Sequence, residues 1–177
     1  MTINFRLKPL SAPLFFAPLL LAACVSGTSA PHALAELQPT QGNTTSGSVR
    51  FVQVAGVLSV SGEVRGLKPN SEHGFHVHEK GDCSSVDGMS AGGHFNPDGK
   101  PHGSHIAMAH HAGDLPSLIA DANGVARFSF ESNTLSVGSG TRNITGRSLI
   151  VHRDPDDYLT QPTGNSGPRL ACAVIKG

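Results

Sequence analysis

The stretch that decides the fold is residues 48–67, which read SVRFVQVAGVLSVSGEVRGL. Its apolar residues are mostly β-branched and partly alternate with polar ones, a pattern typical of strands that bury one face. Gly56 interrupts the run near its middle, where a tight turn needs a residue with wide backbone freedom. The stretch therefore predicts two antiparallel strands joined as a hairpin.

Shorter apolar runs beyond this hairpin predict further strands. They lie at residues 72–78, 118–120, 125–130, 148–151 and 170–175. Upstream, residues 31–45 are polar, and Leu34 and Leu37 are the only apolar pair there that could begin a strand, which we expect at a sheet edge. Short strands with turn-rich joints predict an all-β fold, either a β-sandwich or a β-barrel.

The length and composition fit one exported domain. The chain has 177 residues, with 21 Gly, 12 Pro and no Trp, a profile suited to short strands joined by turns. Thirteen basic and thirteen acidic side chains cancel, so bulk charge gives no reason to expect nucleic-acid binding. We expect the domain over residues 47–177, preceded over residues 24–46 by a flexible linker with room for a first strand.

Residues 1–23 are predicted to form a secretory signal peptide, because two basic residues precede an apolar stretch that ends in two alanines. The apolar run contains Pro18 and is too short to cross a bilayer. The four residues that end at Cys24 match the bacterial lipobox, which predicts Cys24 as the lipidated first residue of a lipoprotein. Ordinary cleavage near Ala30 is the alternative. We expect the mature protein in the periplasm or cell envelope, with a lipid anchor as its one link to a membrane.

Cys83 and Cys172 remain once Cys24 is assigned to lipidation. An exported chain meets an oxidising compartment, where one disulfide is the simplest use of two cysteines. That disulfide would close a loop of about ninety residues and stabilise the fold by a few kcal/mol. Two free structural thiols are the alternative.

The ten histidines point to a metal site, because imidazole is the commonest metal ligand in proteins. His76 and His78 alternate on a predicted strand, so their side chains project from the same face. The segment over residues 79–114 has no clear period and carries more histidines, and His152 ends a later strand. A segment of that length without a regular spacing of apolar residues is usually functional or disordered.

Two metals suit these residues. Three imidazoles and one carboxylate form a tetrahedral set for Zn²⁺, which would order the long segment. His94, His102, His111 and Asp114 stand at that spacing. Four imidazoles without thiolate suit Cu(II) instead. His76, His78, His152 and one histidine of the segment would supply that second set.

Three segments carry a resemblance to a known family: GFHVHE at residues 74–79, GGHFNP at residues 92–97 and GNSGPRLAC at residues 164–172. Together with the zinc spacing, they resemble the bacterial copper-zinc superoxide dismutases from about residue 48 to the C-terminus. The resemblance implies an eight-stranded Greek-key β-barrel, an immunoglobulin-like sandwich, with two long loops over one copper and one zinc.

The resemblance also implies roles for single residues. His94 would bridge the two ions, with the copper held by His76, His78, His94 and His152 and the zinc by His94, His102, His111 and Asp114. Cys83 would pair with Cys172, and Arg169 would stand over the copper.

Outer positions follow from the same resemblance. Asp156 would hydrogen-bond one copper ligand and one zinc ligand, His76 and His102, and so fix the orientation of both rings. Asp157, the next residue, is the alternative by one position. His73 matches a position behind the ligands.

Spacing decides between two neighbouring histidines of the long segment. His111 keeps the expected distances to His102 and Asp114, whereas His110 does not. His32 and His105 are expected to be solvated.

The implied activity converts superoxide to oxygen and hydrogen peroxide, with copper changing its oxidation state and zinc shaping the site. Arg169 would attract and orient the anion. Residues 153–168 contain no lysine, so Lys80 or Lys100 would replace the usual steering charges. Assembly differs between branches of the family, which leaves a homodimer open.

Two other classes of function are weaker. A non-enzymatic copper or zinc carrier of the same fold would be expected to lack Arg169 or part of the ligand set, and both are present. A purely structural domain does not explain six histidines and an aspartate at ligand spacing. We therefore expect an enzyme that protects the cell envelope from superoxide formed outside the cytoplasm.

Overall fold

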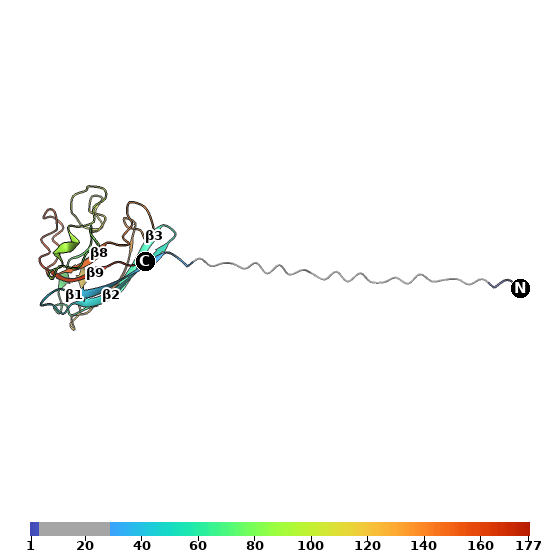
Figure 1. Cartoon of the computed structure of the whole chain (residues 1–177), viewed down its shortest axis with the longest axis horizontal. Coiled ribbons are helices and arrows are strands. Elements are labelled where there is room, and N and C mark those ends of the chain that lie inside the picture. The colour runs from blue at the N-terminus through green and yellow to red at the C-terminus, as the bar shows by residue number, and fades with distance from the viewer. Residues whose placement is uncertain (4–28) are drawn as a thin grey trace.

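The computed structural model describes residues 1–3 and 29–177 (Figure 1). Most of the expected leader, with the lipidation site Cys24, lies outside these residues. Within them, no helix is long and apolar enough to cross a membrane. The described part holds one short 3₁₀ helix, η1 (Met89–Ala91), and nine strands: β1 (His32–Pro39), β2 (Ser46–Val54), β3 (Val57–Arg65), β4 (Glu72–His73), β5 (Phe75–His78), β6 (Leu118–Ile119), β7 (Ala126–Ser132), β8 (Ser148–His152) and β9 (Arg169–Val174).

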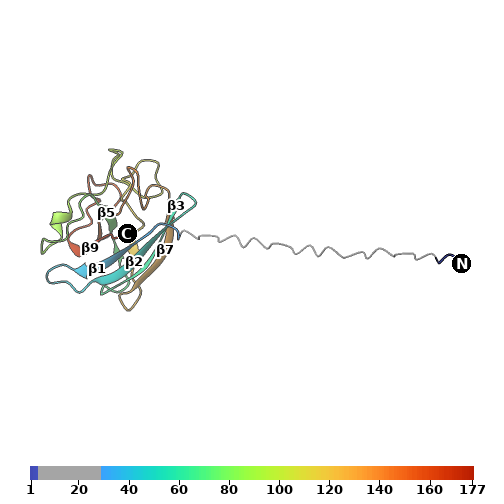
Figure 2. The same cartoon turned by 45° about the vertical axis from the view of Figure 1, so that its right-hand side comes forward.

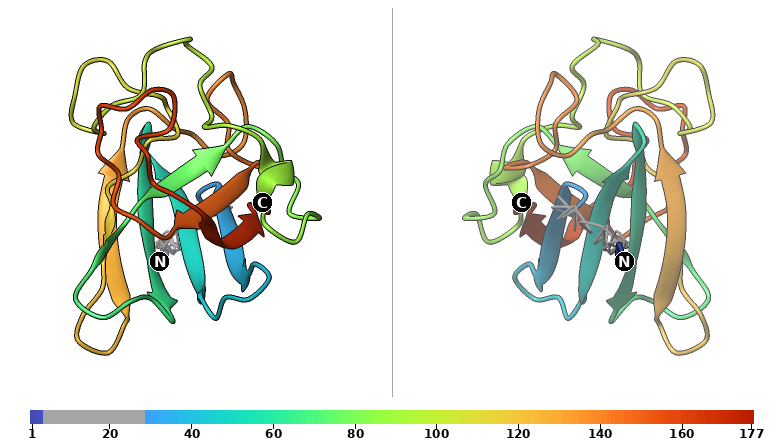
Figure 3. Two further views of the ribbon diagram at one scale, coloured as in Figure 1. Left: turned by 90° about the vertical axis from the view of Figure 1, so that its left-hand side faces the viewer. Right: turned by 90° about the vertical axis from the view of Figure 1, so that its right-hand side faces the viewer.

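Seven of these strands form one curled antiparallel sheet in the order β5-β8-β9-β1-β2-β3-β7, and β4 pairs separately with β6. The sheet folds over at β1, which pairs with β2 through residues 32–37 and with β9 through residues 38–39. Figures 2 and 3 show the two halves of the curled sheet facing each other, and the buried apolar side chains of the main cluster come from both halves. The all-β barrel-like architecture confirms the predicted fold class, with nine strands in the described residues where the resemblance implies eight.

The hairpin predicted over residues 48–67 is present as β2 and β3, which pair along their whole length. Ala55 and Gly56 form the turn with φ of 48° and 87°, and positive φ at both central residues is what the commonest hairpin turn requires. Its inward side chains, among them Phe51 and Leu58, have no exposed area. Burial of each such side chain contributes roughly 1.5–3 kcal/mol, so this hairpin supplies much of the core.

The first strand was expected at an edge of the sheet, and that placement was wrong. β1 lies inside the sheet, between β9 and β2. Its buried face is carried by Ala33, Ala35 and Leu37, which are each at most 1% exposed, while Leu34 faces outward and is 42% exposed. Two of the three inward residues are alanines. Their small size made the buried face of this strand hard to recognise from the sequence.

The single strand expected over residues 72–78 is broken at Gly74 into β4 and β5. The two halves pair with different partners, β4 with β6 and β5 with β8. A Cβ atom at Gly74 would lie 2.8 Å from the Cβ of Ser166, so a glycine is needed where the chain changes partners. The change places β5, with all four residues buried, directly under the long loops.

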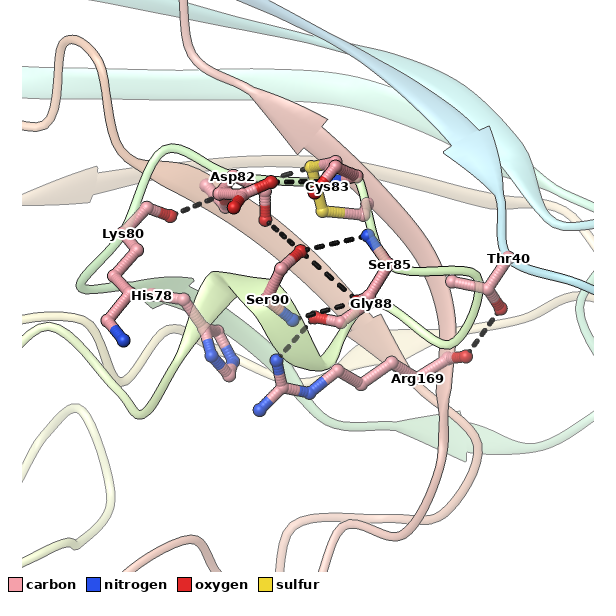
Figure 4. The surroundings of a disulfide bond; sticks show 12 residues. Thr40, His78, Lys80, Asp82, Cys83, Ser85, Gly88, Ser90 and Arg169 are labelled. Carbon is pink, nitrogen blue, oxygen red and sulfur yellow. Dashed lines mark hydrogen bonds between the residues drawn. A yellow bond between two sulfur atoms is a disulfide. The ribbon is translucent and has the colours of Figure 1, made fainter.

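Two long loops, residues 79–117 and residues 153–168, gather at one end of the barrel (Figure 3). A disulfide between Cys83 and Cys172 ties the first loop to β9, with the two Cα atoms 5.8 Å apart (Figure 4). The predicted pairing of these cysteines is therefore confirmed. Closing a loop of 89 residues stabilises the fold by roughly 4–5 kcal/mol in the chain-entropy description.

Candidate metal centre

Four buried histidines form a first cluster beneath the loops. His76 and His78 come from β5, His152 ends β8, and His94 lies in the first loop, held beside His78 by a β-bridge. Each offers one ring nitrogen, and these four nitrogens all lie within 4.8 Å of one another. The structure thus brings together the four residues predicted for copper.

Hydrogen bonds at the far side of three rings determine which nitrogen faces the cluster. The Nδ1 of His78 donates to the carbonyl oxygen of Gly92 at 2.9 Å, and the Nδ1 of His152 donates to that of Gly167 at 3.1 Å. Their Nε2 atoms are left facing each other, 3.4 Å apart. For His76 the two ring nitrogens exchange these roles: Nε2 donates to Asp156 at 2.6 Å, and Nδ1 is the nitrogen left for the cluster.

Two nitrogens of this cluster are buried without any hydrogen-bond partner: Nδ1 of His76 and Nε2 of His94. Leaving a buried polar atom unpaired costs about 1–3 kcal/mol, so such atoms call for an explanation. A metal ion at the centre of the cluster satisfies both of them. The donor set, four imidazole nitrogens, suits copper.

A second cluster surrounds Asp114. Its Oδ1 lies 2.9 Å from Nδ1 of His94, 3.1 Å from Nδ1 of His102 and 3.4 Å from Nδ1 of His111. The Nδ1 atoms of His94 and His111 are 3.4 Å apart. Ligand atoms at about 2.0–2.1 Å from a tetrahedral zinc are roughly 3.3 Å from one another, so these four distances are close to those of a zinc site.

His94 belongs to both clusters. Its Nδ1 points to Asp114, and its Nε2 has no hydrogen-bond partner. Its ring also lies over that of His76, with the two centroids 3.9 Å apart, and it is a member of both groups of donors. A single imidazole therefore separates the two sets of donors.

Asp156 joins the two clusters from behind. Its Oδ2 accepts from His76 and its Oδ1 accepts from Nε2 of His102 at 2.8 Å. The neighbouring Asp157 does something else, since its carboxylate accepts from the backbone of Leu159 and Thr160 within a turn. The choice of Asp156 over Asp157 agrees with these contacts.

Other predicted histidines have separate places. His73 is buried behind the site, and its Nδ1 donates to the carbonyl oxygen of His152 at 2.9 Å. His110 hydrogen-bonds the carbonyl oxygen of Ala107 at 2.7 Å, away from the second cluster that contains His111. His32 and His105 are exposed.

Arg169 is half-buried at the start of β9 and is fixed by the first loop. Its Nη1 donates to the carbonyl oxygen of Gly88 at 2.6 Å (Figure 4). Its Nη2 donates to the carbonyl oxygen of Gly92, also at 2.6 Å. The disulfide of Cys83 anchors this same stretch of loop. The guanidinium is therefore held in one position on the side of the first cluster where His78 lies (Figure 4).

The two lysines considered for steering differ in their surroundings. Lys100 has Asp98 4.0 Å from its ammonium, which offsets its charge. Lys80 is exposed and forms no ion pair within the described part of the chain.

Comparison with known proteins matches residues 45–175 to the family described as copper/zinc superoxide dismutase. The chain belongs to this family. A copper-zinc superoxide dismutase of Paramecium bursaria Chlorella virus 1 is 45% identical over 136 residues, which cover 73% of this chain and 71% of the relative. Copper-zinc superoxide dismutase 2 of Aquifex aeolicus (strain VF5) is 36% identical over 174 residues, covering 96% of this chain and 100% of the relative.

A solved structure, that of the clock protein EA4, has the same fold. Its TM-score is 0.76 at 40% sequence identity, and the match covers 84% of this chain and 96% of that one. Membership of the copper/zinc superoxide dismutase family, with a bacterial relative along nearly the whole chain, confirms the predicted family and enzyme class. It also confirms copper and zinc as the cofactors.

The protonation of the histidines suits the metals of this family. Burial is the main cause that lowers the pKa of His76, His78 and His152, and it lowers the pKa of His94 to about 4. Their rings are therefore neutral near pH 7, which is the form that binds a metal.

The second cluster, around Asp114, contains charged groups, unlike the neutral histidines of the first cluster. Burial opposes the charged form of His102, but the adjacent carboxylates of Asp114 and Asp156 outweigh burial and raise its pKa to about 9. Burial likewise opposes ionisation of the two carboxyls, yet the histidine hydrogen bonds hold the pKa of Asp114 and of Asp156 well below the usual range. Two carboxylates in a buried cluster attract a cation, which fits a divalent ion there.

The sequence did not predict three contacts in residues 153–168. The Gln161 side chain hydrogen-bonds the backbone of His102, and Gly164 packs against the bond between Asp156 and His102. The hydroxyl of Tyr158 lies 2.8 Å from that of Ser117. Gly164 stands in the GNSG motif, which marked the place but not the role.

Proposed function

We propose that this chain dismutates superoxide with one copper and one zinc held by the two clusters. Copper would be bound by His76, His78, His94 and His152, and zinc by His94, His102, His111 and Asp114. The observation that supports this most directly is the position of His94, with one ring nitrogen in each donor set. A carrier of a single metal has no need of such a shared ring.

The reaction takes two superoxide anions and two protons to one oxygen and one hydrogen peroxide. Bound copper would supply the one-electron oxidation of the first anion and the one-electron reduction of the second. His94 would hold a proton at Nε2 while its Nδ1 stays in the zinc ligand set, and it would deliver that proton to the second anion. Solvent would provide the other proton.

Arg169 would capture and orient the anion. A guanidinium carries its charge at every relevant pH and offers five N–H donors. Two of those donors are used by Gly88 and Gly92, which fixes the group and leaves the others for a small anion. Because the geometry exists before the substrate arrives, little ordering is required at each encounter.

We also propose that the enzyme acts in the periplasm or cell envelope, as a lipoprotein attached through Cys24, where it removes superoxide formed outside the cytoplasm. The signal-like leader with its lipobox supports this, and so does the disulfide, which persists in oxidising compartments. The intact mass of the mature protein tests the anchor. A mass that begins at Cys24 plus acyl chains is expected, and an unmodified chain that begins elsewhere contradicts it.

A direct assay tests the proposed reaction. Superoxide decay is followed on protein loaded with copper and zinc, and on the same preparation after removal of both metals by chelation. We expect rapid decay with the loaded protein and background decay with the metal-free control. A folded, metal-replete protein that leaves superoxide untouched would refute the enzymatic function and favour a metal carrier.

A further inference from the structure

Gln161 makes an unusual double contact across the two long loops. Its Oε1 accepts from the backbone N–H of His102 at 2.8 Å, and its Nε2 donates to the backbone carbonyl of His102 at 2.9 Å. A side-chain amide has the same donor and acceptor as a peptide unit, so the pair imitates one step of an antiparallel ladder. The two residues are 59 positions apart in the sequence.

His102 needs this contact more than the other proposed ligands do. His76, His78 and His152 lie on strands, while His94 and Asp114 have β-bridges to β5. His111 lies in irregular chain, but its backbone N–H and carbonyl are both hydrogen-bonded by Asp114, three residues further on. His102 lies in irregular chain and is 3% exposed, and buried backbone groups require partners. In the described structure, both of its backbone polar groups bind side-chain atoms of Gln161.

The ring of His102 is held from the same loop. Its Nε2 binds Asp156, five residues before Gln161, at 2.8 Å. The one polar atom of His102 without a hydrogen bond is Nδ1, which faces the Asp114 cluster. Residues 153–168 therefore determine where this nitrogen points.

The turn that carries Gln161 is itself closed by hydrogen bonds. Asp157 donates its backbone N–H to the carbonyl of Gly164 at 2.9 Å, and Gly164 donates to that of Thr160 at 2.7 Å. The hydroxyls of Tyr158 and Ser117 tie the turn to the chain beside β6. Gln161 thus reaches His102 from a fixed base.

We propose that Gln161 is a positioning residue of the zinc centre: it fixes the backbone of His102 so that Nδ1 is retained in the zinc ligand set and zinc is released slowly. This inference rests on the zinc ligands proposed above. It assigns Gln161 no contact with substrate or metal. Partners of this kind typically change metal affinity by about 10–100-fold when they are removed.

The test compares Gln161→Ala and Gln161→Glu with native protein, all loaded with copper and zinc. Glutamate keeps the size and the acceptor but cannot donate to the carbonyl of His102, so it separates the hydrogen bond from simple loss of volume. Leu159→Ala is the matched control, because the Leu159 side chain is in the same turn and 82% exposed. The rate of zinc transfer to a chromogenic chelator is measured for each protein.

We expect zinc release about tenfold faster from both Gln161 variants and unchanged from Leu159→Ala. Cobalt(II) placed in the zinc site gives a second measurement, since its visible spectrum reports ligand geometry, and we expect it to change in the Gln161 variants alone. Native rates and spectra in both Gln161 variants would overturn the positioning role. Equally fast release from Leu159→Ala would overturn it too. Native protein that fails to hold zinc at all would refute the ligand set instead.

Discussion

Replacing Gly164 by alanine is a sharp test of the link between the two clusters. Gly164 has φ of +64°, and a Cβ built on it would lie 1.9 Å from Oδ1 of Asp156 and 2.5 Å from Nε2 of His102. These are the two atoms of the hydrogen bond that joins the aspartate to the proposed zinc ligand. An added methyl group therefore pushes directly on that bond.

The size of the effect follows from the distances. Ordinary contact begins near 3.4 Å, so Asp156 must retreat by about 1.5 Å, which a 2.8 Å hydrogen bond to His102 does not survive. A hydrogen bond to a charged group contributes roughly 1.5–3 kcal/mol, and the bond from Asp156 to His76 is strained as well. Positive φ adds about 1–2 kcal/mol for alanine. We expect Gly164→Ala to lower the free energy of unfolding by about 3–6 kcal/mol in addition to the backbone strain. We also expect the variant to bind zinc about 10–100-fold more weakly.

Gly99→Ala is the matched control. Gly99 lies in the first long loop with φ of +63°, and a Cβ there would have nothing within 4 Å. It carries the same backbone strain without the collision. The assays are thermal unfolding of the metal-free proteins and competition for zinc against a chelator of known affinity.

The reasoning is refuted if Gly164→Ala unfolds at the temperature of Gly99→Ala and holds zinc as tightly. For a domain of this size, 1 kcal/mol corresponds to roughly 2–4 °C, so a difference of 3 kcal/mol or more is measurable. Equal losses in both variants would mean that Asp156 does not organise the site.

Three further predictions concern the charge, the disulfide and the protons of the site. Arg169→Ala should lower the rate constant for superoxide and weaken its dependence on salt, and an unchanged rate and salt dependence would contradict its role. Cys172→Ser should lower the free energy of unfolding by roughly 4–5 kcal/mol and also lower activity in the remaining folded protein, because the loop that fixes Arg169 is released; urea unfolding and the superoxide assay measure the two effects. Zinc binding to metal-free protein at pH 7.5 should release about one proton, since His102 has a pKa of about 9 and must lose its proton to bind zinc. Calorimetry in two buffers measures that proton, and its release should disappear as the pH rises past 9.

Local patterns predicted most of the barrel. The hairpin of β2 and β3 was evident because β-branched residues and a central glycine specify strands and a turn without help from distant residues. β1 was misplaced because alanines at positions 33 and 35 fill a narrow part of the core, and their small size hid the alternation. The break at Gly74 depends on contact with Ser166, far along the chain, and no local pattern indicates it.

The metal site was predictable to the extent that its chemistry is local. His76 and His78 share a strand face, and the structure places all seven predicted ligands in two clusters. Spacing favoured Asp156 but kept Asp157 as an alternative by one position, because both are carboxylates after His152. Only the hydrogen bonds separate them, one across the site and the other within a turn.

The ligands differ in what holds them, and this difference has a physical consequence. Those proposed for copper alone, His76, His78 and His152, are built on paired strands whose ladders resist local motion. His102 instead depends on side chains from residues 153–168, a loop whose contacts can open without unfolding the barrel. The rings of His76 and His152 also hydrogen-bond Asp156 and Gly167 of this loop, but the backbones of these two histidines are fixed by the sheet, whereas the backbone of His102 is fixed by Gln161. Loosening the loop should therefore displace the backbone of His102, and weaken zinc binding, before it displaces the backbones of the copper ligands. The sequence did not predict this order because the contacts of Gln161 join loops with no period of their own.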